Sequence, residues 1–526
     1  MEPTIIHPYE MHPLDRRGQQ ETFDAVLKWY FGPKQYLILS ADTGLGKTAI
    51  IAALSRYTRI LSLVSTKLLQ DDTYGEYRFP TLKGKANYPC AFNPDYQADV
   101  CAIPAHITGQ AREAICQSGG CQYYEKLYDL CYSPRACLNY SKYLSDGEQD
   151  FNRPGVLALD EAHELPEIVI ESSGFATNIK LNRFLKGYGP FDINDDIPIE
   201  QAIEMMRRMY RIALVNIPSL EKTTTQTTKE IIRHRRRLKR HQSYIDRIVG
   251  TAKRAMGSEE QGHNIWHFST TYSGEFSAKP ITASADFKSI MRIGRRKCIL
   301  LSATITPMIA DMLGIEKSEF EFYEASRPYP AYLRPVYDLN VKGMGHKQTK
   351  KAPALWSIQS VKISNILKQY PEWSAVILTS SKAKGSALAG RLKALGHDVF
   401  TPPLDIGTDK QLEAWKAYRK PGAVCISHNF WTGVSLREDR LLFIASIRFP
   451  DISTPLEKAR MGRSMKEFLY RAAVYLVQGC GRNQRGFLED YLPVGQRFVF
   501  LADGNYKRVK AFAPGDFKER LRPWED

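Results

Sequence analysis

The chain has 526 residues, of which 43% are hydrophobic, and it is therefore long enough for several domains that each bury a core. This composition excludes a disordered chain, and no apolar run approaches the ~20 residues that a membrane-spanning helix requires. The net charge of +16 favours a polyanionic partner such as nucleic acid. The first residues lack the pattern of a signal peptide, so we expect a cytoplasmic protein that does not bind membranes.

An apolar run at 36–40 ends in a glycine-rich loop, and a helical pattern follows at 48–55. A strand, a loop and a helix in this order can surround phosphates with backbone N–H groups, while a lysine contacts the β and γ oxygens and a hydroxyl binds Mg²⁺. Ala41 replaces the first glycine of the usual pattern, but the strand and the helix argue against a chance glycine-rich turn. The residues predicted to bind the nucleotide here are Thr43, Gly44, Gly46, Lys47 and Thr48.

Six of the nine cysteines lie between Cys90 and Cys137. In a reducing cytosol, clustered cysteines are more often metal ligands than disulfides, and an odd total argues against a fully paired framework. Four thiolates suit an iron–sulfur cluster or a tetrahedral zinc ion, and buried cysteines without a ligand are the remaining alternative. We therefore predict a metal-binding segment downstream of the glycine-rich loop.

Further apolar runs end in polar residues, which is typical of strands at the carboxyl edge of an α/β sheet. The run at 156–159 ends in Asp160 and Glu161, and the run at 298–301 ends in Ser302. We expect Asp160 to orient Mg²⁺ and Glu161 to position or activate the attacking water. Similar runs recur at 375–379, 423–427, 441–445 and 498–501. Two α/β domains are predicted, meeting near residues 325–340, where Arg-Pro pairs suggest a linker.

The segment between Asp160 and Ser302 is longer than one helix and one strand require. Helical patterns at 199–215 and 229–256 predict an inserted helical domain. The second pattern contains the basic run 233–240, whose cations cannot all share one face at about 3.6 residues per turn. We predict that some of them follow nucleic-acid phosphates, with a solvated helix or an import-type signal as the alternatives.

The segment Gln478-Gly-Cys-Gly-Arg-Asn-Gln-Arg485 places two arginines at a predicted helix start in the second domain. The planar guanidinium of arginine can neutralise the charge that develops on a transferred phosphoryl group. We predict that Arg482 and Arg485 reach across an interdomain cleft to the nucleotide. Solvated surface arginines are the alternative interpretation.

Four segments together resemble the ordered motifs of superfamily-two helicases, and the chain resembles the XPD/DinG family within that group. They are Ala-Asp-Thr-Gly-Leu-Gly-Lys-Thr (41–48), Asp-Glu-Ala-His (160–163), Ser-Ala-Thr (302–304) and the segment 478–485. Members of the family carry an iron–sulfur domain between the first two motifs and a helical arch between the second and third, and both insertions have counterparts here. The segments 83–90, Cys121-Gln-Tyr-Tyr-Glu and Asn139-Tyr140 resemble parts of the iron–sulfur domain.

The resemblance implies an α/β fold with two RecA-like parallel-sheet motor domains. Motor domain 1 would cover 1–82, 141–165 and 281–326, the iron–sulfur domain 83–140, the arch 166–280 and motor domain 2 327–526. The implied catalytic residues are Lys47, Asp160, Glu161, His163, Gln478, Arg482 and Arg485, acting on ATP with Mg²⁺. The implied ligands of a [4Fe–4S] cluster are Cys90, Cys101, Cys116 and Cys121, with zinc as the less favoured metal and with Cys131 and Cys137 as spare thiols.

The resemblance further implies an ATP-dependent DNA helicase that moves 5′ to 3′ on single-stranded or forked DNA in repair, replication or recombination. Its size suggests a monomer in the cytoplasm of a prokaryote or of a phage-infected cell, and Trp431 and Tyr140 are candidates for stacking on bases. Two family acids are replaced by Thr432 and Ser435, and Asn505 stands where an arginine is expected after Asp503. The alternative is therefore a nucleic-acid-binding ATP switch or a redox-sensing protein with little unwinding activity.

Overall fold

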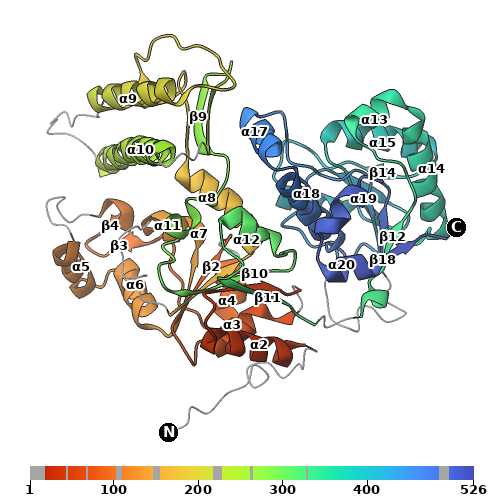
Figure 1. The fold of residues 1–526 in the computed structure, drawn as a ribbon, viewed down its shortest axis with the longest axis horizontal. Helices are drawn as coiled ribbons and strands as arrows, with labels where there is room; N and C mark the ends of the chain where they lie inside the picture. Colours follow the sequence, from red (N-terminus) through yellow and green to blue (C-terminus); the bar gives the residue numbers. More distant parts are fainter. Residues whose placement is uncertain are drawn as a thin grey trace, which may run out of the picture.

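Two lobes, each built on a parallel sheet, make up the computed structural model of the protein (Figure 1). The structure describes residues 18–42, 45–66, 69–101, 109–145, 155–216, 228–260, 265–326, 330–484 and 497–525. The predicted α/β class with two parallel sheets is confirmed. Among the described helices, none is both long and apolar enough to cross a membrane.

The first sheet has six parallel strands in the order β11-β1-β10-β6-β2-β5. Its strands are β1 (Tyr36–Ser40), β2 (Ile60–Val64), β5 (Arg135–Asn139), β6 (Val156–Asp160), β10 (Lys297–Ser302) and β11 (Phe320–Glu324). The predicted strands at 36–40, 156–159 and 298–301 are confirmed to within a residue. Pairing of Ser40 with Ser302 and of Leu301 with Asp160 aligns the carboxyl ends of the three central strands at one edge.

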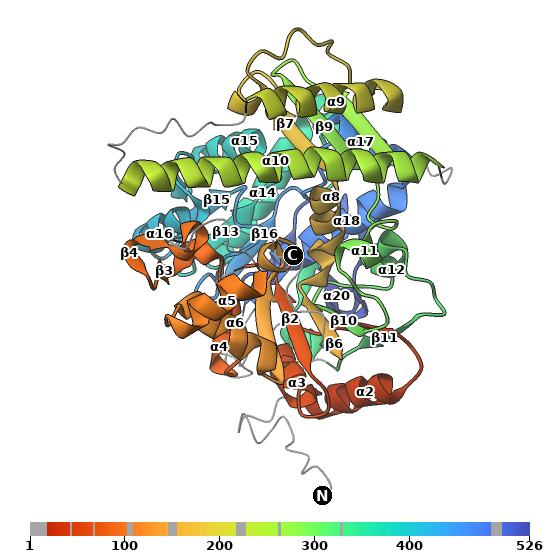
Figure 2. The same cartoon turned by 90° about the vertical axis from the view of Figure 1, so that its left-hand side faces the viewer.

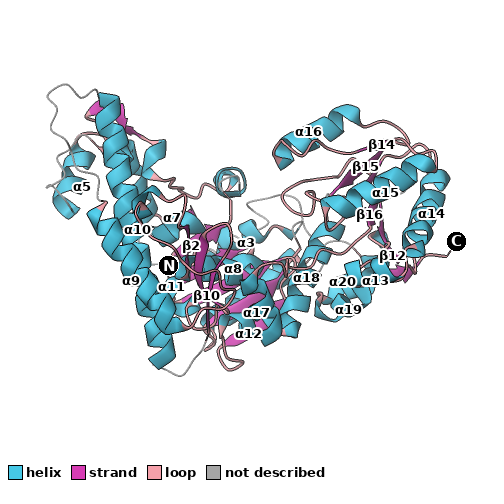
Figure 3. Cartoon of the chain, turned by 90° about the horizontal axis from the view of Figure 1, so that it is seen from above, coloured by secondary structure: helices cyan, strands magenta, loops and turns pink. Residues whose placement is uncertain are grey.

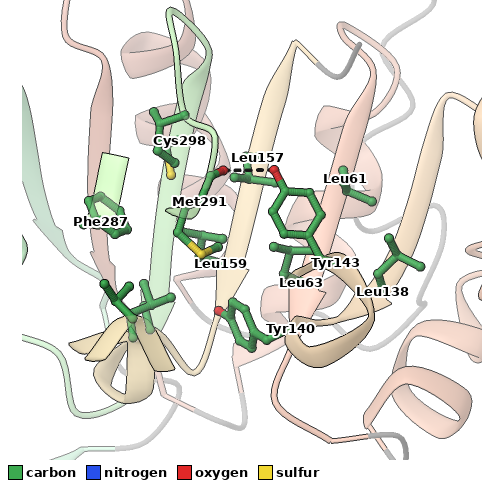
Figure 4. Packing of buried hydrophobic residues seen from close by; sticks show 14 of the residues in the cluster. Leu61, Leu63, Leu138, Tyr140, Tyr143, Leu157, Leu159, Phe287, Met291 and Cys298 are labelled. Carbon is green, nitrogen blue, oxygen red and sulfur yellow. Dashed lines mark hydrogen bonds between the residues drawn. The ribbon is translucent and has the colours of Figure 1, made fainter. Parts of the chain in front are cut away.

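Both faces of this sheet are covered by helices, so its central strands are buried on each side. The helices are α2 (Gln19–Phe31), α3 (Lys47–Leu54), α7 (Tyr140–Ser145), α8 (Leu165–Ser173), α11 (Phe287–Ile290) and α12 (Met308–Leu313). On one face, Leu61, Leu157 and Leu159 pack with Tyr140 and Tyr143 of α7 (Figure 4). The Tyr143 hydroxyl donates a 2.9 Å hydrogen bond to the Met291 carbonyl, which satisfies its polar end within the core.

The second sheet has seven parallel strands in the order β14-β15-β13-β16-β17-β12-β18. They are β12 (Val336–Asp338), β13 (Ala375–Leu378), β14 (Val399–Phe400), β15 (Val424–Ser427), β16 (Leu441–Ile444), β17 (Phe498–Leu501) and β18 (Leu521–Pro523). The accompanying helices are α13 (His346–Lys351), α14 (Ala354–Gln369), α15 (Lys382–Ala394), α16 (Thr408–Tyr418), α17 (Pro455–Arg463), α18 (Met465–Cys480), α19 (Tyr506–Val509) and α20 (Gly515–Arg520). The four apolar runs predicted as strands in this half are all strands of this sheet.

Two insertions leave the first sheet between consecutive strands (Figure 2). The cysteine-rich insertion, between β2 and β5, contains α4 (Tyr74–Glu76), β3 (Pro89–Cys90), β4 (Asn93–Gln97), α5 (Gly109–Ser118) and α6 (Gln122–Tyr132). The helical insertion, between β6 and β10, contains β7 (Phe175–Asn178), α9 (Ile199–Val215), α10 (Thr228–Glu260), β8 (Trp266–Thr270) and β9 (Glu275–Pro280). The predicted helices at 199–215 and 229–256 are therefore confirmed as α9 and α10. Seen from above, both helices lie beside α5 in one arm of the molecule (Figure 3).

Candidate nucleotide site

The glycine-rich loop joins β1 to α3 at the carboxyl edge of the first sheet. Gly46 has φ +84°, a left-handed conformation that glycine adopts without strain, and Lys47 begins α3 immediately after it. The Lys47 ammonium donates to the Ala41 carbonyl at 3.2 Å, so the side chain folds back over the loop. Thr48 is buried beside it, whereas the predicted Thr43 and Gly44 lie outside the described residues. The free N–H groups at the start of α3 can bind an anion.

Asp160 and Glu161 follow β6 at the same edge. The Asp160 carboxylate accepts hydrogen bonds from the Glu161 N–H at 3.0 Å and from the Tyr74 hydroxyl at 3.3 Å. Burial raises the pKa of Asp160 to about 6, while the nearby Lys47 opposes the rise. A buried carboxylate of raised pKa beside a phosphate-binding loop fits a Mg²⁺ site, because the cation would favour the ionised form. Glu161 has φ +50°, a strained conformation for a residue with a side chain.

A chain of polar contacts runs from Glu161 across the cleft to the second sheet. His163 Nδ1 lies 2.8 Å from the Ser302 hydroxyl, and its Nε2 lies 2.7 Å from the Gln478 amide nitrogen. Burial lowers the pKa of His163, so the ring is neutral at pH 7. An amide donor at Nε2 assigns the proton to Nδ1, which donates to Ser302, and Ser302 in turn donates to the Glu161 carboxylate at 3.4 Å. The structure thus brings together three predicted site residues, Glu161, His163 and Gln478, with Ser302 of the Ser-Ala-Thr motif.

A small cleft of about 60 Å³ lies between the lobes and is lined by Glu161, Thr304 and Gln478. Its wall also includes Arg334 and Arg520, which the sequence motifs did not indicate. The Arg334 guanidinium contacts Asp42 of the glycine-rich loop at 2.8 Å and Asp516 at 3.2 Å. Burial lowers the pKa of Arg520, and its proximity to Arg334 adds to the effect. In this state the two guanidinium groups are paired with carboxylates that line the same cleft, Asp42 and Asp516.

Gln19 is a third residue that the sequence motifs did not indicate. Its buried amide donates to the Leu45 carbonyl at 3.0 Å and so ties the start of α2 to the glycine-rich loop. Gln19 is the first residue of α2 and follows Gly18, which has φ +80°. A glycine directly before a polar residue at a helix start is the sequence signal that could have indicated Gln19. This hydrogen bond is a polar contact of the loop that does not involve the phosphates.

The predicted helix start at Gln478 is wrong, because α18 ends at Cys480 and Arg482 follows the helix. The glycines on either side of Cys480 disfavour a helix, and a Cβ at Gly479 would lie 2.8 Å from the Trp431 ring. Arg482 is 3% exposed and donates to the carbonyls of Trp431 at 2.9 Å and Val434 at 3.0 Å. Arg485 lies outside the described residues.

Base stacking by Trp431 and Tyr140 is contradicted by their burial. Trp431 is enclosed in the second core, and its indole N–H donates to the Thr379 carbonyl at 2.8 Å. Tyr140 packs in the first core, and its hydroxyl donates to the Asp160 carbonyl at 2.8 Å (Figure 4). Both aromatic residues support the loops of the cleft, so neither presents a ring face to solvent.

The four predicted cluster ligands are buried in one apolar cluster, whereas Cys137 belongs to the core on the other face of the sheet. The sulfur atoms of Cys90 and Cys101 lie 3.7 Å apart, and the Cys121 N–H donates to the Cys116 carbonyl at 2.9 Å. Within the described ranges, no group of three or more Cys, His, Asp or Glu side chains is arranged to hold a metal ion. The donor chemistry of the four thiols fits a cluster or zinc, and the ligand set remains a prediction.

The basic run lies on α10, where it passes the cysteine-rich insertion. Arg236 donates to the Asp99 carboxylate at 3.0 Å and to the Gln97 side chain at 2.7 Å. The remaining described cations of the run, Arg233, Arg237, Lys239 and Arg240, are exposed. One member of the run thus joins the two insertions, and the others are available to solvent or to a polyanion.

A second contact between the lobes lies beside the cleft. Arg460 of α17 is buried and forms a bidentate ion pair with Glu167 of α8, at 2.8 and 2.9 Å. Glu457 and Glu467 also contact Arg460, and Arg471 contacts both Glu167 and Glu457. Because α8 directly follows the segment 160–163, this ion-pair group connects the acidic pair to the second lobe.

Two parallel α/β domains that face one cleft define the architecture of RecA-like motors, and comparisons with known proteins specify it further. No protein-family model matches the chain, and no curated protein matches its sequence. An XPD helicase structure matches with TM-score 0.59 at 15% identity, covering 97% of this chain and 100% of the other. The structure of S. tokodaii Xpd4 matches with TM-score 0.55 at 13% identity, covering 97% and 100% respectively. An apo XPD structure matches with TM-score 0.51 at 14% identity, covering 96% and 99%.

The chain therefore has the fold of XPD helicase structures over nearly its whole length. This confirms the resemblance predicted from the motifs at the level of the fold. At these identities the likeness establishes architecture alone, and activity has to be argued from the site.

Proposed function

We propose that the chain is an ATP-dependent DNA helicase that translocates 5′ to 3′ on single-stranded DNA. The observation that carries the proposal is the polar chain Gln478–His163–Ser302–Glu161, which connects the second domain to the predicted catalytic carboxylate. A motor needs such a link, because hydrolysis at one domain has to change the position of the other. The XPD-like fold supports the same function.

ATP would lie against the glycine-rich loop, with Lys47 on the β and γ oxygens. Thr48 and Asp160 would hold Mg²⁺, which supplies charge neutralisation on the phosphates when bound. Glu161 orients the attacking water and accepts its proton as the oxygen bonds to the γ-phosphorus. The bond to the β–γ bridging oxygen breaks, giving ADP and inorganic phosphate. Arg482 and Arg485 would stabilise the charge on the transferred group after the cleft closes.

The neutral His163 ring transmits the state of Glu161 to the second domain. A change in the protonation of Glu161 alters the hydrogen bond from Ser302, and therefore the bonds that Ser302 and His163 make in turn. Gln478 is the last member of this chain and belongs to α18 of the second domain. Loss of the γ-phosphate would thus weaken the contact between the domains, and the cleft could reopen by one step.

The single strand would pass between the helical and cysteine-rich insertions, where Arg236 contacts Asp99. We propose that Cys90, Cys101, Cys116 and Cys121 bind a [4Fe–4S] cluster that stiffens the second of these insertions into a wedge. The Cys90–Cys101 separation of 3.7 Å is also close to the ~3.8 Å expected for two thiolates on tetrahedral zinc. Iron, zinc and acid-labile sulfide analysis of anaerobically purified protein distinguishes the two, and about four irons per chain supports the cluster.

The function is tested by ATP turnover with and without single-stranded DNA, and by strand displacement on a forked duplex with a 5′ tail. Lys47→Ala should abolish both activities, whereas Lys317→Ala, at an exposed lysine of the same domain, should leave both unchanged. Survival of DNA-stimulated turnover in Lys47→Ala would overturn the assignment. A 3′-tailed fork that is unwound as well as the 5′-tailed one would overturn the polarity.

A nucleic-acid-binding ATP switch is the second candidate, favoured by the exposed Thr432 and Ser435 in place of acidic residues. These neutral side chains stand in the loop whose carbonyls hold Arg482. A switch would bind ATP and DNA and yet show little DNA-stimulated turnover and no unwinding. The same assays therefore separate the two functions.

A further inference from the structure

Helix α6 exposes two tyrosines that lie one turn apart. Tyr128 is 52% exposed and Tyr132 is 70% exposed, and their ring centroids are 4.3 Å apart with an interplanar angle of 36°. Aromatic side chains of this size are usually buried, and an exposed pair offers flat faces to a ligand that stacks. Neither ring takes part in the nucleotide site described above.

A hollow beside these rings extends to the residues that follow α4. It is lined by Arg78, Phe79, Pro80, Thr81, Lys126, Tyr128, Asp129 and Tyr132. Phe79 forms a buried floor, and the Arg135 guanidinium lies 5.6 Å from its ring centroid. We call the group Arg78, Lys126, Tyr128, Tyr132 and Arg135 the α6 surface.

Within the described residues, no carboxylate forms an ion pair with the cations of the α6 surface. In the described part of the chain, none of Arg78, Lys126 and Arg135 forms an ion pair, and neither does the neighbouring Arg56. Arg56 and Arg78 lie close enough to Arg135 to lower its pKa, in addition to the effect of burial. Asp129 is the one acidic residue lining the hollow, and the cations outnumber it. Such a cluster favours an anionic ligand.

The surface is held rigidly at the end of its helix. The Arg59 guanidinium donates to the Leu130 carbonyl at 3.3 Å and to the Cys131 carbonyl, which fixes the last turn of α6. On the inner side of the same helix, Tyr123, Leu127 and Leu130 are buried in the first core. The two tyrosines are thus preorganised, and stacking on them would order few further groups.

The α6 surface lies at the opposite edge of the first sheet from the nucleotide site. Arg59 directly precedes β2 and Arg135 begins β5, whereas Asp160 and Ser302 stand at the carboxyl ends of their strands. Strands of five residues separate the two edges by about 17 Å. The side of the first lobe that carries α6 also faces away from the second lobe (Figure 1).

We propose that the α6 surface binds unpaired nucleic acid, with bases stacked on Tyr128 and Tyr132 and phosphates held by Arg78, Lys126 and Arg135. Stacking on exposed tyrosines requires bases that are free of pairing, and the adjacent cations fit the backbone of the same strand. An acidic peptide would satisfy the cations and leave the rings unused. The inference rests on the proposed function and adds to it a second contact site outside the motor cleft, for a flanking or a displaced strand.

The test is fluorescence anisotropy with labelled oligonucleotides, combined with photocrosslinking of 5-iodouracil-substituted strands. The double variant Tyr128→Ala, Tyr132→Ala should bind a strand of about 40 nucleotides roughly tenfold more weakly than the unmodified chain does. The double variant Tyr128→Phe, Tyr132→Phe keeps the ring faces and is expected to bind as the unmodified chain does. Lys126→Ala should reduce the slope of log affinity against log salt by about 0.7.

Crosslinks should map to the peptide that contains Tyr128 and Tyr132. Iodouracil placed in the tail of a single strand or in the displaced arm of a fork identifies which strand occupies the surface. Equal binding by the alanine and phenylalanine variants, with no crosslink in this peptide, would refute the inference and leave the helicase assignment intact. If the unmodified chain binds no single-stranded DNA in any assay, the proposed function and this inference both fail.

Discussion

The contact between Gln478 and His163 predicts a measurable coupling between the two domains. The Gln478 amide nitrogen lies 2.7 Å from His163 Nε2, in a partly buried site and across 315 residues of sequence. A neutral hydrogen bond contributes about 1 kcal/mol net, so the pair should show a coupling free energy of about that size. Each single alanine variant removes the hydrogen bond. The second substitution should therefore lower kcat/KM by a factor about fivefold smaller in the double variant than it does alone.

The assay is a double-mutant cycle on kcat/KM for DNA-stimulated ATP hydrolysis, with Gln478→Ala, His163→Ala and the double variant. A control cycle pairs Gln478→Ala with Tyr74→Phe, because Tyr74 contacts Asp160 and does not contact Gln478. The control effects should add to within ~0.5 kcal/mol. Additive effects in the Gln478–His163 cycle would refute the idea that this contact couples the domains.

Three further predictions concern charged side chains. Burial raises the pKa of Asp160 to about 6, so the contribution of this side chain to folding stability falls as the pH rises through that value. Asp160→Asn should therefore raise the melting temperature measured without Mg²⁺ at about pH 8, and should raise it by less at about pH 5. The same substitution should abolish ATP hydrolysis. The Arg460 side chain is 2% exposed and that of its partner Glu167 is 44% exposed. Arg460→Met should therefore lower the free energy of unfolding by about 2–4 kcal/mol, and Glu167→Gln by about 1 kcal/mol. A larger loss of stability in Glu167→Gln than in Arg460→Met, measured by urea unfolding, would contradict this explanation. Asp99→Arg should break the ion pair with Arg236, separate the two insertions and speed the dissociation of single-stranded DNA. The double variant Asp99→Arg, Arg236→Asp exchanges the two charges and should restore the slower dissociation rate in stopped-flow measurements.

Local patterns were sufficient to predict seven strands of the two parallel sheets and the helices α3, α9 and α10. The run at 36–40 is apolar up to Ser40 because a parallel strand covered on both faces has no solvent side, and that pattern can be recognised without a structure. The helix at 199–215 was found from its amphipathic period, and its bounds agree with α9. The resemblance to helicase motifs then ordered these elements into two domains.

Contacts between distant segments could not be predicted in this way. Arg334 meets Asp42 across 292 residues, and nothing in the Arg-Pro linker indicates that its guanidinium turns inward. The burial of Trp431 was also missed, because a tryptophan two residues before a glycine is equally compatible with a stacking residue and with a core residue. Gly479 decides between the two by allowing the ring to lie against α18, and that packing is visible only in three dimensions.

The position of Arg482 suggests how nucleotide could recruit it under the proposed function. Its guanidinium donates to the carbonyls of Trp431 and Val434, in the loop where Thr432 and Ser435 stand in place of acids of the family that the chain resembles. Leaving a neutral acceptor costs about 1 kcal/mol per bond, whereas leaving a buried carboxylate would cost about 3–5 kcal/mol. A charge-assisted bond to a phosphate oxygen contributes more than either lost neutral bond, so the exchange can favour the nucleotide.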